Sequence, residues 1–375
     1  MKRILIITPS EISLQAVGAP LMLARLFSGV SPDSLTIVAR DIVAPRDSRW
    51  HSNALLKYTL GNIRTTMRSV KALTQAAEAV IAKQRPDSIL ITSDTGSCFI
   101  AGYRLAKRYK LPYDLFIFDL WLGNFLKPFD RLLAWVYDRQ IFTGARTVFA
   151  AGEGLAGHFL RSYGITAVVI NNPIPKEAEA PLAIHGSPVG NPPVMLYPGS
   201  IYWAQADSIR AVSKALEGTG IELHIYTPQS AEQIARLGIG GRQVKVFPQL
   251  PSVEIIQKER ASDILLVALS FSRRGRRVLN TASPGKFSEF LASGTPILAV
   301  APAHSFITET SQNRQLALAV PTLDSNEIKA FLQRLLADST LRKNLATRAR
   351  QVALAEYTIE INASRLLTAL HLYDA

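Results

Sequence analysis

The chain has 375 residues, of which 48% are hydrophobic, and a formal net charge of +13. This length exceeds what one hydrophobic core usually supports and predicts about two or three domains. No apolar run reaches the roughly 18 residues of a membrane span, and a single cysteine, Cys98, excludes a disulfide framework and a cysteine metal site. A reducing compartment is therefore expected.

The amino-terminal half alternates short apolar runs with longer, helix-compatible segments. The first run, Ile4 to Thr8, follows Met1-Lys2-Arg3 and lacks the length and flanks of a signal peptide, so it predicts a first strand in a cytoplasmic protein. The strands predicted in this half are 4–8, 35–39, 88–92, 115–118 and 147–150, with helices at 62–83 and 129–142. The alternation favours a Rossmann-type parallel sheet.

A proline-rich stretch and a second strand–helix series follow. Residues 171–193 hold six prolines with little periodicity, which is typical of a linker. The later strands are predicted at 194–197, 222–226, 244–247, 264–269, 297–301 and 316–320, with helices at 326–336, 341–355 and 356–373. We therefore predict an amino-terminal domain at 1–175, onto which the 356–375 helix packs back, the linker at 171–193, and a carboxyl-terminal domain at 190–355.

The most informative segment is 283–296, with the sequence SPGKFSEFLASGTP. Ser283 is a typical N-cap, the following proline suits the first helical position, and Gly294 is typical just past a helix end. Lys286 then lies in the first turn, near the positive end of the helix dipole, which costs roughly 0.3–1 kcal/mol unless an anion is beside it. A phosphate would supply that anion. The alternative is an ordinary core helix with a solvated Lys286–Glu289 pair.

Two Rossmann-like halves, a proline-rich linker and a final helix resemble the GT-B glycosyltransferases. Segment 283–296 resembles the donor-binding motif of the family 4 (group 1) glycosyltransferases, while 194–200, 247–251 and 261–266 are similar to other strands and turns of that family. The resemblance spans nearly the whole chain, but only 283–296 is specific. It implies an α/β GT-B fold in which two Rossmann-like domains face a cleft and the C-terminal helix returns to the N-terminal domain.

The resemblance also implies an enzyme of the hexosyltransferase type. It would move a sugar from a nucleotide-diphosphate sugar, a UDP-sugar first of all, to a saccharide or lipid-linked acceptor, as in polysaccharide biosynthesis. Transfer would retain the anomeric configuration and need neither metal nor a further cofactor. The residues agree with this, because the six histidines are scattered and no Walker loop or G-x-G-x-x-G fingerprint is present.

The helix after Ser283 supplies the main predicted donor contacts. The resemblance implies that Glu289 accepts hydrogen bonds from the ribose, and that Lys286 and the helix start at Ser283 and Gly285 hold the diphosphate. An ionised carboxylate is a strong acceptor for two adjacent hydroxyls, and a diphosphate needs cations or oriented amides. Lys286 would also act in catalysis, since charge develops on the leaving diphosphate.

Other loops complete the predicted donor site, and some depart from the family pattern. Gly199 and Ser200 would let backbone N–H groups approach the diphosphate, and Pro251 would border the base or merely connect a strand to a helix. The basic run at Arg273 would replace the family's usual arginine and lysine, or be a solvated loop. Thr281 stands where the family has an acid. A non-catalytic GT-B protein, which binds a nucleotide-sugar or supports a partner subunit, is therefore the alternative function.

Asp119 is the predicted catalytic residue of the amino-terminal half. It follows a strand predicted at 115–118, so it belongs at the carboxyl edge of the sheet, where α/β proteins bind ligands. It would orient an acceptor or donor-sugar hydroxyl. Alternatively, it caps the next helix.

The positive charge indicates an anionic partner. No nucleic-acid-binding module accompanies the basic clusters, so no nucleic acid is expected; a nucleic-acid binder would show steeply salt-dependent DNA retention. Segment 50–73 mixes basic residues with Trp50 and leucines, and predicts either peripheral association with an anionic membrane surface at the inner face or packing against the sheet.

Overall fold

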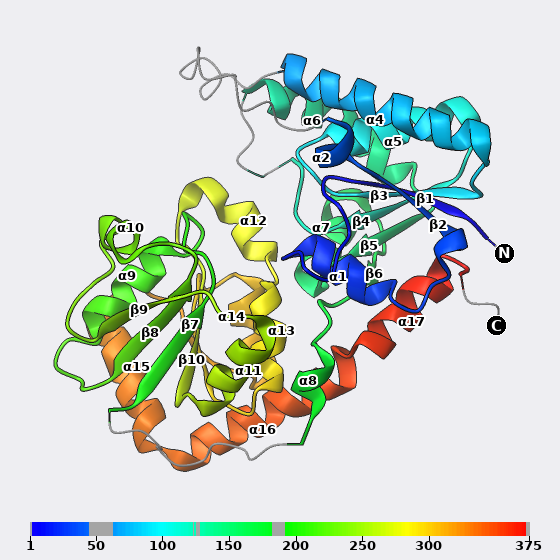
Figure 1. Ribbon diagram of the computed structural model, residues 1–375. Helices are drawn as coiled ribbons and strands as arrows, with labels where there is room; N and C mark the ends of the chain where they lie inside the picture. The colour runs from blue at the N-terminus through cyan, green and yellow to red at the C-terminus, as the bar shows by residue number, and fades with distance from the viewer. Residues whose placement is uncertain (1, 45–62, 123, 125–127, 182–191, 373–375) are drawn as a thin grey trace. The chain divides into compact units, whose positions relative to one another are not determined.

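The computed structural model describes residues 2–44, 63–122, 124, 128–181 and 192–372, and the chain divides into two compact units (Figure 1). Unit 1 comprises Met1–Asn172 and Glu360–Ala375, and unit 2 comprises Pro173–Ile359. In the described residues, each unit holds a six-stranded sheet whose paired strands are all parallel. Two Rossmann-like α/β domains were predicted, and this is confirmed.

Unit 1 alternates strand and helix along the chain. Its strands are β1 (Ile4–Thr8), β2 (Leu35–Ala39), β3 (Ser88–Thr92), β4 (Tyr113–Ile117), β5 (Thr147–Ala150) and β6 (Val168–Val169), in the sheet order β2-β1-β3-β4-β5-β6. Its helices are α1 (Ala19–Leu26), the 3-10 helix η1 (Pro32–Ser34), α2 (Arg40–Val43), α4 (Ile63–Lys83), α5 (Ser97–Tyr109), α6 (Pro128–Thr143), α7 (Glu153–Tyr163) and the C-terminal α17 (Ile359–Ala369).

The two faces of the unit 1 sheet pack against different helices. Ile4 and Ile6 share one buried cluster with α1 and with Leu366 and Leu370 at the end of the chain, so α17 returns to unit 1 as predicted. Helices α4 and α5 cover the opposite face (Figure 1). There α5 lies so close to β3 that a Cβ on Gly102 would come within 2.5 Å of the Ile91 side chain.

Unit 2 repeats the pattern. Its strands are β7 (Val194–Pro198), β8 (Glu222–Thr227), β9 (Val244–Pro248), β10 (Ile264–Ala268), β11 (Ile297–Val300) and β12 (Leu318–Val320), in the order β12-β11-β10-β7-β8-β9. Its helices are α8 (Lys176–Glu179), α9 (Ala206–Ala215), α10 (Ala231–Arg236), α11 (Ser252–Ala261), η2 (Arg273–Gly275), α12 (Arg276–Thr281), α13 (Gly285–Ala292), α14 (Phe306–Arg314), α15 (Ser325–Ala337) and α16 (Ser339–Glu356).

Alternation along the unit 2 strands separates two buried clusters. Leu196 and Leu265 face α11, α13, α14 and α16, whereas their neighbours Met195 and Ile264 face α9, α10 and α15 (Figure 1). Strands buried on both faces are the near-continuous apolar runs that the sequence displays. Within the described residues no helix has both the length and the apolar character to cross a bilayer.

A buried arginine fixes the helix that carries the specific sequence motif. Arg350 on α16 donates to the carbonyl oxygens of Glu179 and Ala180 at the end of α8, at 3.0 and 2.7 Å, and to that of Ala292 in the last turn of α13. Carbonyls in the last turn of a helix have no partner inside it. Burial lowers the pKa of Arg350, but its guanidinium replaces those missing partners and holds the end of α13 in place.

Candidate functional site

The sheet of unit 2 changes direction between β7 and β10. The chain runs outward from β7 through β8 and β9, then returns to place β10 on the other side of β7. Loops at the carboxyl ends of strands flank a crevice at such a switch point, where open α/β sheets bind ligands. The candidate site of unit 2 is therefore formed by the loops after β7 and β10 and by the elements that follow them.

Hydrogen bonds tie these two loops together. Asp207, in the first turn of α9, accepts from the Ser270 hydroxyl at 2.8 Å and from the Phe271 amide at 2.9 Å. The Ser270 amide donates to the Ala204 carbonyl at 2.7 Å. Asp207 was not predicted from the sequence, although an acid in the first turn of the helix after a glycine turn was a usable signal. Its carboxylate ties the loop after β10 to the first turn of α9.

The glycine turn after β7 has the backbone geometry that requires glycine. Gly199 has a φ of 131°, which other residues rarely adopt. Its N–H, however, donates to the Tyr226 carbonyl in β8 at 2.8 Å, so this amide belongs to the sheet. Gln229 holds the next turn by accepting from the Ile201 amide at 2.6 Å and donating to the Ile201 carbonyl at 2.9 Å. Ser200 lies between these anchors, and its predicted diphosphate contact stays a prediction.

Helix α13 starts one residue later than the sequence predicted. Pro284 has φ −57° and ψ 134°, an extended conformation, so it is the N-cap, and Gly285 is the first helical residue. The prediction that Ser283 is the N-cap is therefore wrong. The end was predicted correctly, because Gly294 follows the C-cap with a φ of 77°. Lys286 consequently lies in the first turn, one position nearer the helix start.

Lys286 and Glu289 form an ion pair on α13. The Lys286 ammonium donates to Glu289 Oε2 at 2.7 Å, and the side chains are 39% and 8% exposed, respectively. The chain itself thus supplies the anion that Lys286 needs at the start of a helix. The pairing matches the alternative drawn from the sequence, except that the carboxylate is buried rather than solvated. The ribose and diphosphate contacts of these residues stay predictions.

A second carboxyl, Glu259 on α11, belongs to the same cluster. Its residue is 1% exposed, and its Oε1 has no hydrogen-bond partner among the described residues. Burial, reinforced by the negative charge of Glu289, raises the pKa of Glu259 to about 8, against the opposing effect of Lys286. At neutral pH Glu259 therefore keeps its proton. Glu259 was not predicted from the sequence, although its helical spacing from Ile255 and Ile256, which are buried, would have placed it on the core face of α11.

A cationic hollow lies at the carboxyl ends of β10, β11 and β12. Its volume is about 290 Å³, and its lining includes Arg273 from η2, Arg276 and Asn280 from α12, and His304 from the loop after β11. The two arginines and the histidine are exposed. The structure thus places Arg273 in a recess suited to an anion, while Lys286 and Glu289 are not part of its lining.

Two positions of the predicted donor site, Thr281 and Pro251, had an uncertain role in the sequence. Thr281 ends α12 and is 6% exposed; its hydroxyl donates to the carbonyls of Arg277 and Val278, both at 3.1 Å, within its own helix. It therefore offers no carboxylate in place of the family's acid. Pro251 is the exposed N-cap of α11, beside Leu250, which packs against the unit 2 core. The contact of Pro251 with a base stays a prediction.

Asp119 lies at the corresponding edge of the unit 1 sheet, two residues after β4. The residue is exposed, and loss of hydration at its carboxyl raises its pKa to about 6. The next helix, α6, begins only at Pro128, so Asp119 is not its N-cap. Two residues after β3, by contrast, Asp94 accepts from the amides of Gly96, the N-cap of α5, and of Cys98 in its first turn, and it pairs with Arg40 at 3.0 Å.

No group of three or more His, Cys, Asp or Glu side chains in the described part of the chain lies close enough to hold a metal ion. The membrane-associated segment predicted at 50–73 lies largely outside the described residues, since the description resumes at position 63.

Comparisons with known proteins bear on the fold. No protein-family model and no curated protein sequence matches the chain. It is similar to a sucrose-phosphate synthase from Thermosynechococcus elongatus, with a TM-score of 0.71, 13% identity, and coverage of 99% of this chain and 98% of that one. It is also similar to an α,α-trehalose 6-phosphate synthase from Burkholderia multivorans, with a TM-score of 0.67, 10% identity, and coverage of 99% of this chain and 98% of that one. A third similar structure is Anabaena HepE in complex with UDP-glucose, with a TM-score of 0.65, 15% identity, and coverage of 99% of this chain and 100% of that one. At such identities these likenesses show the fold alone: the chain has the two-domain GT-B fold.

Proposed function

We propose that this protein is a glycosyltransferase that takes its sugar from a nucleotide-diphosphate sugar, with a UDP-sugar as the first candidate. The observation that carries the proposal is the cationic hollow of Arg273, Arg276 and His304, which opens at the carboxyl edge of a Rossmann-like sheet in a chain of GT-B fold. Solved structures of similar fold include a sugar-phosphate synthase and a protein bound to UDP-glucose, which supports such a donor.

Stabilisation of the leaving diphosphate is the proposed source of catalysis. Negative charge builds up on that group as the glycosidic bond breaks, and fixed cations stabilise it better than water can. Arg273 and Arg276 are the groups we assign to this role, and Lys286 with Glu289 to the nucleoside side of the donor. Asp119, which carries a charge above a pH of about 6, would orient a hydroxyl of the acceptor or the donor sugar.

The finer features follow from the family 4 resemblance and are part of the proposal. Transfer would proceed with retention and without a metal, the acceptor would be a saccharide or a lipid-linked sugar of polysaccharide biosynthesis, and the enzyme would work in the cytoplasm as a peripheral protein of the anionic inner membrane face. The net charge of +13 supports an anionic surface as partner.

A thermal-shift panel of UDP-, GDP- and dTDP-sugars tests the donor site directly. A ligand that binds only the folded state at about 100 times its Kd stabilises it by about 2.7 kcal/mol, so the preferred donor should stand out clearly. Arg276→Gln should reduce that shift, and Arg242→Gln, which removes an exposed arginine outside the hollow, should not. Radiolabelled transfer from the preferred donor then distinguishes an enzyme from a binding protein. A panel with no shift for any donor would refute the proposal.

A further inference from the structure

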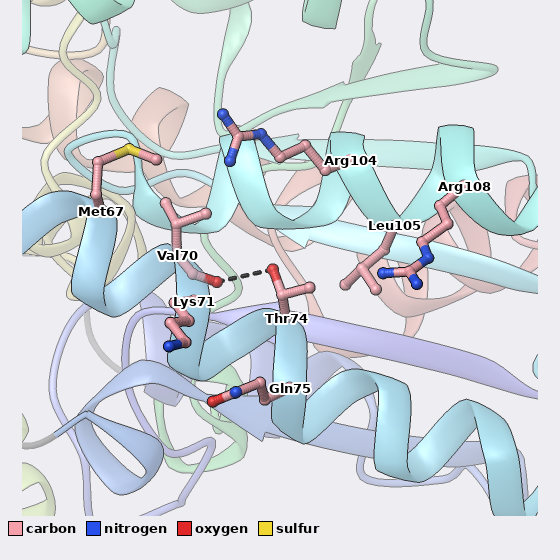
Figure 2. Close-up of a pocket in the computed structure, with 8 residues that line it drawn as sticks. All are labelled: Met67, Val70, Lys71, Thr74, Gln75, Arg104, Leu105 and Arg108. Atoms are coloured by element: carbon pink, nitrogen blue, oxygen red, sulfur yellow. Dashed lines mark hydrogen bonds between the residues drawn. The ribbon is translucent and has the colours of Figure 1, made fainter.

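A second recess lies on unit 1, between helices α4 and α5. Figure 2 shows its lining residues, which are Met67, Val70, Lys71, Thr74 and Gln75 on α4 and Arg104, Leu105 and Arg108 on α5. Its volume is about 430 Å³. We refer to it as the α4–α5 groove. Asp119 does not line it, so it is separate from the carboxyl edge of the sheet.

The floor of the α4–α5 groove is aliphatic. Val70 and Leu105 are 2% and 0% exposed, and Met67 is half-buried beside them. The Thr74 hydroxyl donates to the Val70 carbonyl at 2.7 Å, back along α4, as the dashed line in Figure 2 shows. The hydroxyl is therefore used within the helix, and the floor favours methylene groups over water or a bare ion.

The rim of the groove is cationic. Lys71, Arg104 and Arg108 are all exposed there. Arg104 donates to the Tyr137 hydroxyl at 3.1 Å, and Arg108 pairs with Glu78 at 2.6 Å while its side chain stays 68% exposed. Both guanidiniums keep further N–H donors for a ligand.

The two helices that form the groove concentrate positive charge. Glu78 is the one acidic residue in their sequences, against seven basic residues: Arg64, Arg68, Lys71, Lys83, Arg104, Lys107 and Arg108. Two helices thus supply a net charge of +6, close to half of the +13 of the whole chain. Such a surface attracts anions over a Debye length, and the groove gives them a place to bind.

We propose that the α4–α5 groove binds the phosphate headgroup of an anionic phospholipid and so holds unit 1 on a bilayer. The phosphate would lie between Lys71, Arg104 and Arg108, and the glycerol and first methylenes would cover the aliphatic floor. A free phosphate gains nothing from that floor, and a nucleic acid finds no aromatic ring among the lining residues on which a base could stack. The inference extends the proposed membrane association to one site and does not depend on sugar transfer.

Helix α6 supplies an apolar surface in the same unit. Leu132, Trp135 and Val136 are 53%, 71% and 45% exposed on it, and Tyr137 of this helix is the residue that contacts Arg104 at the rim. Exposed tryptophan next to basic residues is typical of proteins that rest in the interface of a bilayer. Electrostatic attraction and shallow apolar insertion would therefore act together.

Flotation of the full-length protein with vesicles tests the proposal. We expect binding to vesicles of phosphatidylcholine mixed with phosphatidylglycerol, and little binding to phosphatidylcholine alone. The double variant Lys71→Gln with Arg104→Gln should weaken partitioning about 30-fold, because each basic residue near an anionic surface contributes roughly fivefold in affinity and the two factors multiply. The matched control is Lys214→Gln with Arg236→Gln, two exposed basic residues of unit 2, which removes the same charge.

The outcomes separate the groove from general adsorption. A much smaller loss in the control than in the groove variant supports the proposal, whereas equal losses would show that net charge alone attracts the bilayer and would overturn it. Release of the protein from vesicles by soluble glycerol phosphate would show that the groove prefers a free phosphate, and would also overturn it. Circular dichroism verifies that both variants fold, and an unchanged thermal shift with the nucleotide-sugar donor separates this test from that of the proposed function.

Discussion

Replacing Glu259 by glutamine should make the folded protein increasingly more stable than the wild type as the pH rises. The folded-state pKa is raised from 4.5 to about 8, so the folded protein keeps a proton that the unfolded chain releases near pH 4.5. Wild-type stability therefore falls as the pH rises from about 4.5 to 8, with a slope of about 1.4 kcal/mol per pH unit. Glutamine does not titrate, so between pH 5 and pH 7 the variant should gain about 2 to 3 kcal/mol relative to the wild type.

Urea unfolding of both proteins at several pH values, followed by circular dichroism, measures this difference. Glu254→Gln is the matched control, because Glu254 lies on the same helix α11 but is exposed. We expect the control to show no comparable trend over the same range. A difference between Glu259→Gln and the wild type that stays constant with pH would refute the protonated, buried state of Glu259.

Three further predictions concern other parts of the protein. Asp119→Asn should lower the rate of transfer about 100-fold with an unchanged melting temperature, and wild-type activity should fall as the pH drops through about 6; a flat pH profile would contradict an ionised Asp119. Lys286→Met leaves the buried Glu289 carboxylate without that cation, so it should lower the free energy of unfolding by about 1 to 2 kcal/mol, measured with urea. The effect should be lost in the double variant Lys286→Met, Glu289→Leu. Gly96→Ala should cost about 2 to 4 kcal/mol, because φ is 123° and the added Cβ would lie 2.7 Å from the Trp121 ring, whereas Gly29→Ala meets nothing within 4 Å and should be tolerated.

The strands were the most predictable part of the fold. Buried parallel strands are apolar on both faces, so runs such as 88–92 and 297–301 stand out in the sequence, and the structure shifts their ends by few residues. Strand β6 was missed, because two valines are too short a run to carry any period. The end of α13 was predicted correctly from Gly294, which follows the C-cap with a positive φ. Its start was not, because the extended Pro284, rather than Ser283, is the N-cap.

The site was harder to predict, because its charges depend on contacts between distant segments. Lys286 needs an anion beside it near the start of a helix, but the sequence alone could not decide between a ligand and Glu289, three residues ahead on the same helix. Glu259 comes from another helix, and the effect of Glu289 on the pKa of Glu259 appears only when α11 and α13 pack on the same face of the sheet. The same holds for Asp207, whose partners at Ser270 and Phe271 are far along the chain.

The position of one proton also bears on where a diphosphate would bind. With Glu259 neutral, the positive charge of Lys286 is balanced by Glu289, so this cluster attracts a second anion weakly. In the hollow, Arg273 and Arg276 have no ion pair with any described residue, so their charge is available to a ligand. A doubly charged diphosphate is therefore expected to favour the two arginines, which leaves Glu289, already oriented by Lys286, for hydroxyl donors of the ribose. This division of roles differs from the one implied by the family resemblance, in which Lys286 itself holds the diphosphate.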